Sequence, residues 1–263
     1  MQPNELVRQA QRCLAEVLKE FALRCGGTVL DENGLLLVAV DHPCPIFVNS
    51  ALRTGPIGAE EALHRSQAFF AARKHPCETW VLLGADDDLE QAAVSAGMRV
   101  AIELVGMVLQ QNPEMPDIPA GSELRRVQDV QGVRDFTRVA KEAFAGEAPG
   151  FGDLIGKIFS DPRSLLAPDT AGFVVYHQGD PASVAMAMVQ EGVAWIGWVA
   201  TAGKFRGQGL GRLATAAATR AGFALGADFA SLEATKMGVP VYTRLGYREV
   251  LRYRTYWPAE FVV

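Results

Sequence analysis

Hydrophobic and polar positions follow two different periods along the chain. In four segments the apolar residues recur every three or four positions, which predicts amphipathic helices. These segments are residues 4–24, 58–73, 130–145 and 210–225. Elsewhere, short apolar runs bounded by Gly, Asn, Asp or Pro predict strands, so the chain has the pattern of an α+β protein. The main runs are residues 28–30, 35–40, 46–49, 80–83, 100–110, 172–176, 183–189, 193–201 and 229–234.

A proline-rich segment divides this pattern into two halves. Residues 112–121 contain three prolines and show no hydrophobic period, which indicates a linker. We therefore expect one domain at residues 1–111 and a second at residues 122–263.

The two halves share an order of elements and one matching spacing. Trp80 and Gly97 are 17 residues apart, and Phe229 and Gly246 are also 17 residues apart. This register predicts an internal repeat of two similar domains, each a mostly antiparallel mixed sheet flanked by helices. A glycine-rich segment in the second half has no glycine-rich counterpart in the first half.

That glycine-rich segment lies between the strand at residues 193–201 and the helix that follows it. It consists of Arg206-Gly207-Gln208-Gly209-Leu210-Gly211. The first turn of a helix leaves backbone N–H groups unpaired, and the helix dipole places partial positive charge on them. Glycines, which lack a Cβ atom, let a bulky anion approach this backbone closely. With Lys204 and Arg212 beside it, the segment predicts a binding site for a pyrophosphate.

Two common nucleotide-binding patterns do not fit this segment. A P-loop requires GxxxxGK[ST], which the sequence lacks. A dinucleotide fingerprint requires GxGxxG directly after a strand of a parallel sheet. Here the glycines have a different spacing, a loop separates them from the strand, and the preceding strands predict an antiparallel meander.

Two motifs together point to a family. Residues 206–211 fit the pattern Arg/Gln-x-x-Gly-x-Gly/Ala, and residues 241–247 read Val-Tyr-Thr-Arg-Leu-Gly-Tyr. In these motifs, and in the order of the predicted elements around them, residues 122–257 resemble the GNAT superfamily of N-acetyltransferases. The first half resembles a degenerate copy, as in tandem members of that superfamily. The resemblance implies acetyl-CoA as co-substrate.

The resemblance also implies roles for individual residues. The backbone at the end of the strand 193–201 would pair with the pantetheine arm, and the amides of the glycine-rich segment would hold the pyrophosphate. Tyr242 would act as the general acid that protonates the departing thiolate. Thr235 occupies a position where the family often has Asn, for which its hydroxyl would substitute. The implied coenzyme-binding residues are Val199, Ala200, Thr201, Arg206, Gly207, Gln208, Gly209, Leu210, Gly211, Arg212 and Thr235.

No general base is evident, because the strand at residues 193–201 contains no carboxylate. Glu233 and Glu147 are candidates, but a structural or solvated role accounts for either, and a neutral amine could attack without a base. Trp195 and Trp198 are expected on opposite faces of their strand by simple alternation. One of them could line an acceptor pocket, which would favour an apolar or aromatic substrate.

Composition narrows the classes of partner. The net charge of −5 and the pI near 5.5 provide no general attraction to nucleic acid or to an anionic membrane. The four cysteines do not have metal-ligand spacing, so no metal is expected. The sequence shows no signal peptide and no membrane-spanning run, so we expect a cytoplasmic location. Either a monomer or a homodimer fits these features.

The sequence therefore predicts an acetyl-CoA-dependent N-acetyltransferase that modifies a primary amine of a small molecule. Two alternatives stay open at this point. One is a non-catalytic module that senses acyl-CoA or mediates an interaction, and the other is a peptide or protein N-acetyltransferase.

Overall fold

The computed structural model describes residues 3–261, and the strands within them form one eleven-stranded sheet. The order across the sheet is β1-β2-β3-β4-β11-β5-β10-β9-β8-β7-β6. Two neighbouring pairs, β3 with β4 and β9 with β10, are parallel, and the other paired strands are antiparallel. This mostly antiparallel mixed sheet confirms the predicted fold class. The strands are β1 (Thr28–Glu32), β2 (Leu35–Ala39), β3 (Ser50–Arg53), β4 (Glu78–Leu82), β5 (Arg99–Leu109), β6 (Ser122–Arg126), β7 (Thr170–His177), β8 (Asp180–Gln190), β9 (Val193–Thr201), β10 (Phe229–Ala234) and β11 (Arg248–Trp257).

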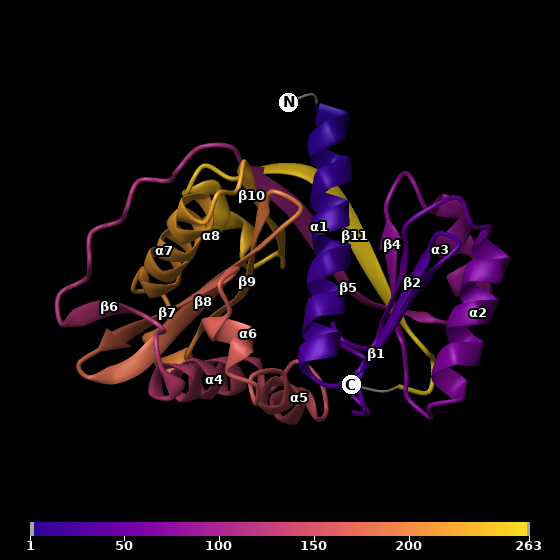
Figure 1. Ribbon diagram of the computed structural model, residues 1–263, viewed down its shortest axis with the longest axis horizontal. Coiled ribbons are helices and arrows are strands. Elements are labelled where there is room, and N and C mark those ends of the chain that lie inside the picture. Colours follow the sequence, from indigo (N-terminus) through magenta and orange to yellow (C-terminus); the bar gives the residue numbers. More distant parts are fainter. Residues whose placement is uncertain (1–2, 262–263) are drawn as a thin grey trace.

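Helices cover both faces of this sheet (Figure 1). Met107 of β5 packs in the cluster formed with α7 and α8, whereas its neighbour Val108 packs in the cluster formed with α1 and α4. We call these the α7 face and the α1 face. Between residues 3 and 261, no helix has the length and apolar character needed to cross a membrane. The helices are α1 (Pro3–Arg24), α2 (Ala59–Ala71), α3 (Asp87–Ser95), α4 (Val130–Phe144), α5 (Phe151–Ile158), α6 (Arg163–Leu166), α7 (Leu210–Ala224) and α8 (Val239–Thr243), with a 3₁₀ turn at Gly203–Phe205.

The two halves of the chain exchange strands at the centre of the sheet. β5 belongs to the first half but pairs with β10, and β11 belongs to the second half but pairs with β4. β5 and β11 also pair with each other, from Arg248 opposite Val108 to Trp257 opposite Arg99. The strands expected in two domains therefore form one continuous sheet, an arrangement that the sequence does not predict.

Corresponding elements recur in the two halves. The parallel pair β3 and β4 is connected through α2, and the parallel pair β9 and β10 is connected through α7. A short helix then precedes each exchanged strand, which begins at Arg99 in the first half and at Arg248 in the second. Residues 112–119 contain no helix or strand and run around the outside of the second half (Figure 1).

The position of α7 is fixed by small side chains. A Cβ atom at Gly222 would lie only 2.4 Å from the Cβ of Ala194 on β9, so any larger residue there would push the helix away. Ala214, Ala216 and Ala218 of the same helix are fully buried against the sheet. The alanine-rich composition thus brings the N-terminus of α7 close to the end of β9.

One local prediction is wrong. Residues 46–49 form a turn rather than a strand, and β3 begins at Ser50. The Asn49 side chain fixes this turn, since its Oδ1 accepts the Val40 N–H at 2.8 Å and its Nδ2 donates to the carbonyl oxygens of His42 and Cys44. These side-chain bonds replace the backbone bonds that a strand would make.

Candidate functional site

β9 and β10 are paired over only part of their length. Phe229, Ala230 and Ser231 of β10 lie beside residues 193–195 of β9, and no pairing between the two strands extends beyond this point. β9 continues to Thr201 with β8 along its other edge. We call the space between residues 196–201 and residues 232–234 the wedge. The backbone predicted to bind a ligand, residues 199–201, lies along its open edge, where an extended ligand can add as a strand.

A bulge in β9 lies beside the wedge. Trp198 has a φ of 51°, and the pairing of β9 with β8 shifts register between Val184 and Met186. The extra residue reverses the alternation of side chains. Trp195 and Trp198 therefore lie on the same face, where both rings contact Phe21 of α1. The prediction that they lie on opposite faces is wrong for this reason.

The glycine-rich segment forms the N-terminus of α7, as predicted. Gly207 and Gly209 have φ values of 78° and 80°, a backbone conformation that favours glycine. A Cβ atom at either position would point into open space. No side chain caps the helix, so the amides of its first turn are available to an anion. A Cβ at Gly211 would lie 3.0 Å from Thr201 Oγ1, so glycine also lets the helix approach β9.

Basic side chains surround these amides. Arg206 is exposed, and its Nε donates to the carbonyl oxygen of Thr201 at 3.2 Å. Lys204 pairs with Asp180 at 3.1 Å. Gln208 and Arg212 are exposed beside them. The Arg206 contact therefore holds its guanidinium between the end of the wedge and the start of α7.

Tyr242 lies on the α7 face, packed against Tyr247 with 6.1 Å between ring centroids. A Cβ at Gly238 would lie 2.8 Å from its ring, so glycine is needed for this packing. Burial raises the pKa of Tyr242 well above its usual value, so the phenol stays protonated at neutral pH. Thr235, the other predicted residue nearby, is exposed, and its Oγ1 accepts the Gly238 N–H at 3.3 Å.

Glu233 faces the opposite side of the sheet from Tyr242. The Trp195 Nε1–H donates to Glu233 Oε2 at 2.8 Å, from β9 to β10. Phe47, from the turn in the first half, stacks on the Trp195 ring with 5.6 Å between centroids. Neither contact could be inferred from local pattern, because the residues are far apart in sequence and Phe47 lies in a segment expected to be a strand.

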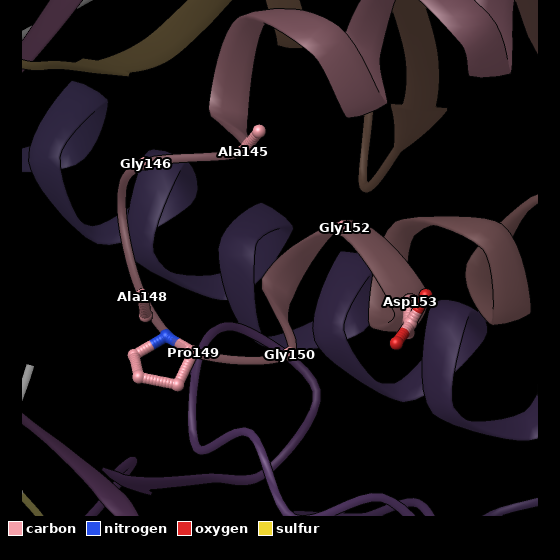
Figure 2. A pocket seen from close by; sticks show the side chains of 7 residues that line it. All are labelled: Ala145, Gly146, Ala148, Pro149, Gly150, Gly152 and Asp153. Atoms are coloured by element: carbon pink, nitrogen blue, oxygen red, sulfur yellow. The ribbon is translucent and has the colours of Figure 1, made fainter.

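A cavity of about 400 Å³ lies in the loop between α4 and α5 (Figure 2). The aromatic residues on either side of this loop, Phe144 and Phe151, both have ring centroids 6.2 Å from that of Trp198. Glu147 is exposed in the same loop. The lining residues are Ala145, Gly146, Ala148, Pro149, Gly150, Gly152 and Asp153. The cavity is thus lined by the loop itself, and the rings of Phe144 and Phe151 at the two ends of the loop pack with Trp198 on the α1 face.

The corresponding place in the first half is closed by ion pairs. Arg53, at the end of β3, pairs with Asp86 and Asp88 at 2.6 Å each. Its Nη1 also donates to the Ile57 carbonyl oxygen at 3.4 Å. The side chain therefore links the end of β3 to the start of α3 and the loop before α2.

Comparison with known proteins relates part of the second half to a family. Residues 138–247 match the Acetyltransferase (GNAT) family. This part of the chain is a GNAT domain. The match includes β9 and β10, which border the wedge, together with the glycine-rich segment, α7 and Tyr242. A search of curated proteins gave no match.

Solved structures with the same fold cover nearly the whole chain. A GCN5-related N-acetyltransferase from Kribbella flavida is 22% identical over 94% of this chain and 95% of its own, with a TM-score of 0.72. One from Sphaerobacter thermophilus is 17% identical over 87% and 82%, with a TM-score of 0.63. A tandem GNAT protein from the clavulanic acid biosynthesis pathway is 13% identical over 88% and 78%, with a TM-score of 0.57. The GNAT domain is therefore part of a fold that extends through both halves.

The described residues, 3–261, contain no group of three or more His, Cys, Asp and Glu side chains arranged to hold a metal ion.

Proposed function

We propose that the GNAT domain transfers the acetyl group of acetyl-CoA to a primary amine of a small molecule. The observation that carries this proposal is the open edge of β9 next to the uncapped N-terminus of α7. An extended pantetheine arm fits the first, and a pyrophosphate fits the second. The open edge of β9 and the N-terminus of α7 are joined by the residues from Thr201 to Gly209, so one extended ligand could reach both.

Different residues around the wedge would have different roles in the transfer. Backbone groups of residues 199–201 would orient the thioester, and the amides from Gly207 to Arg212 would bind the pyrophosphate. As the amine nitrogen bonds to the thioester carbon and the carbon–sulfur bond breaks, Tyr242 would donate its proton to the thiolate. Burial keeps the Tyr242 phenol protonated at neutral pH, so the proton that this role requires is present.

A small acceptor is favoured over a polypeptide by the α1 face. α1 and α4–α6 cover this face, and the cavity of about 400 Å³ in the α4–α5 loop has room for a small molecule.

Thermal unfolding with and without acetyl-CoA tests the coenzyme assignment. At about 100 times its dissociation constant, a ligand that binds only the folded state adds roughly 2.7 kcal/mol to the free energy of unfolding. ATP and NADH at the same concentration serve as controls and should leave the melting temperature unchanged. Stabilisation by either control but not by acetyl-CoA contradicts the proposal.

A thiol-release assay over a panel of amines then tests turnover. Release of CoA with at least one primary amine is the expected result. Stabilisation by acetyl-CoA without release from any amine would instead favour a sensing module. Release with peptides but not with small amines would favour a peptide N-acetyltransferase.

A further inference from the structure

Glu233 is one of the β10 residues that border the wedge, and its side chain lies on the α1 face. β10 is paired with β9 up to Ser231, and Glu233 is two residues further on, so by alternation its side chain points to the same face as that of Ser231. Leu232 and Ala234, the residues on either side of Glu233, pack on the α7 face in the same cluster as Tyr242. The Glu233 carboxyl thus lies where β9 and β10 separate, on the face of the sheet opposite to that of Tyr242.

Trp195 holds the carboxyl in this place. A Cβ at Gly197 would lie 1.8 Å from the Trp195 ring, so the ring lies directly over Gly197. From there its Nε1–H donates to Glu233 Oε2. The other oxygen, Oε1, makes no hydrogen bond to another residue in the described part of the chain and is left for a substrate.

The first half of the chain clamps the indole. Phe47 stacks on the Trp195 ring with an interplanar angle of 25° and meets the Trp198 ring at 5.3 Å between centroids. Its backbone, with a φ of 65°, is anchored because the Phe47 N–H donates to the buried Glu78 carboxylate at 2.9 Å. The turn at residues 46–49 therefore sets the position of Trp195.

The surroundings of Glu233 provide no cation. Among the described residues its carboxylate forms no ion pair, and the titratable groups that face it are Cys13 on α1 and Tyr253 on β11. Burial raises the pKa of Glu233 to about 7, and the Trp195 hydrogen bond opposes this effect only in part. A carboxyl of this kind both accepts and releases a proton near neutral pH.

We propose that Glu233 is the general base of the acetyl transfer and that Trp195, clamped by Phe47 from the first half, is its positioning residue. This inference rests on the proposed function. As the amine nitrogen bonds to the thioester carbon, one N–H proton passes to Glu233 Oε1, and the Tyr242 proton passes to the departing thiolate. Glu233 then loses its proton to solvent and Tyr242 regains one, so the protons balance over one turnover.

Glu233→Gln tests the assignment, because glutamine keeps the shape and still accepts the Trp195 hydrogen bond. With an alkylamine that the wild type acetylates, we expect kcat to fall about 10²- to 10⁴-fold. The rising limb of the pH–rate profile near pH 7 should disappear, while stabilisation by acetyl-CoA stays unchanged. Glu249→Gln, on an exposed carboxylate bonded to Arg252, is the matched control and should retain the wild-type profile.

A readout independent of turnover is the carboxyl carbon of Glu233 in protein labelled with ¹³C-glutamate. One carbon should titrate near pH 7, vanish in Glu233→Gln and move to higher pH in Trp195→Phe, because the indole bond stabilises the carboxylate. Phe47→Ala should lower kcat at least tenfold with the acetyl-CoA stabilisation intact. Phe69→Ala, on α2, is its control.

Two results would overturn the inference. One is a Glu233→Gln enzyme with the wild-type rate and pH profile, and the other is a Glu233 carbon that titrates in the normal range near pH 4.5. Loss of the pH limb in Glu147→Gln instead would transfer the role to the α4–α5 loop. Because acetyl-CoA stabilisation is measured separately, none of these results counts against the proposed function.

Discussion

A carboxyl whose pKa is raised by burial makes the folded protein less stable as the pH rises. Glu233 has a pKa of about 7 in the folded state, against 4.5 as its ordinary value. Below pH 4.5 it is protonated in both states, so its titration has no effect there. Between pH 4.5 and 7 the folded state keeps the proton while the unfolded state has lost it, and the free energy of unfolding falls. Above pH 7 the full effect, about 3 kcal/mol, is reached.

Glu233→Gln removes this dependence, because glutamine does not titrate. The difference in unfolding free energy between variant and wild type should therefore grow in favour of the variant by about 2 kcal/mol from pH 5.5 to pH 8.5. Urea denaturation of both proteins at the two pH values measures it, and comparing the differences cancels any pH-independent effect of the substitution. Glu249→Gln should give no such gain, because its Arg252 partner lowers the pKa of Glu249. A difference that stays constant with pH would refute the reasoning.

Three further substitutions probe the site and the core. Tyr242→Phe should lower kcat about 10²-fold or more while acetyl-CoA affinity, measured by calorimetry, stays near the wild-type value; an equal loss of both would make the tyrosine structural. Gly209→Val should weaken acetyl-CoA binding and cost about 1–3 kcal/mol of stability, because valine is strained at a φ of 80°, and Gly203→Ala, outside that region, should do neither. Phe21→Ala should lower the unfolding free energy by about 3–5 kcal/mol in urea titrations. The Phe21 ring is fully buried against Phe47, Phe159, Trp195 and Trp198. A loss no larger than that of the half-buried Phe69→Ala would contradict this packing.

Local pattern was sufficient to predict most of the elements. The meander of β7, β8 and β9, the helix after the glycines and the hairpin at Asn33-Gly34 all depend on residues close together in sequence. The pyrophosphate site could be predicted for the same reason, because one short segment supplies its amides. The structure places that segment at a helix N-terminus, and its ligand stays a prediction.

The rest depends on contacts between distant residues. The bulge at Trp198 inserts a residue that no feature of the composition marks, so alternation alone predicts opposite faces for Trp195 and Trp198. The apolar residues at 46–49 fit a strand, but the Asn49 side chain fixes them in a turn. Trp195 and Glu233 are neighbours only because β9 and β10 separate after three residue pairs. Alternation within one strand cannot show where its partner leaves it.

The exchange of β5 and β11 has a consequence for synthesis on the ribosome. β4 in the first half lies beside β11, which follows β5 to β10 in the chain and is therefore synthesised after all of them. The first half therefore cannot complete its sheet as it emerges, and the edge of β4 stays exposed until β11 has left the ribosome. Such pairing between residues far apart in sequence is slow to form, and exposed strand edges make a chain prone to aggregation. We expect the first half to complete its fold only once β11 has been synthesised, so that both halves fold as a single cooperative unit.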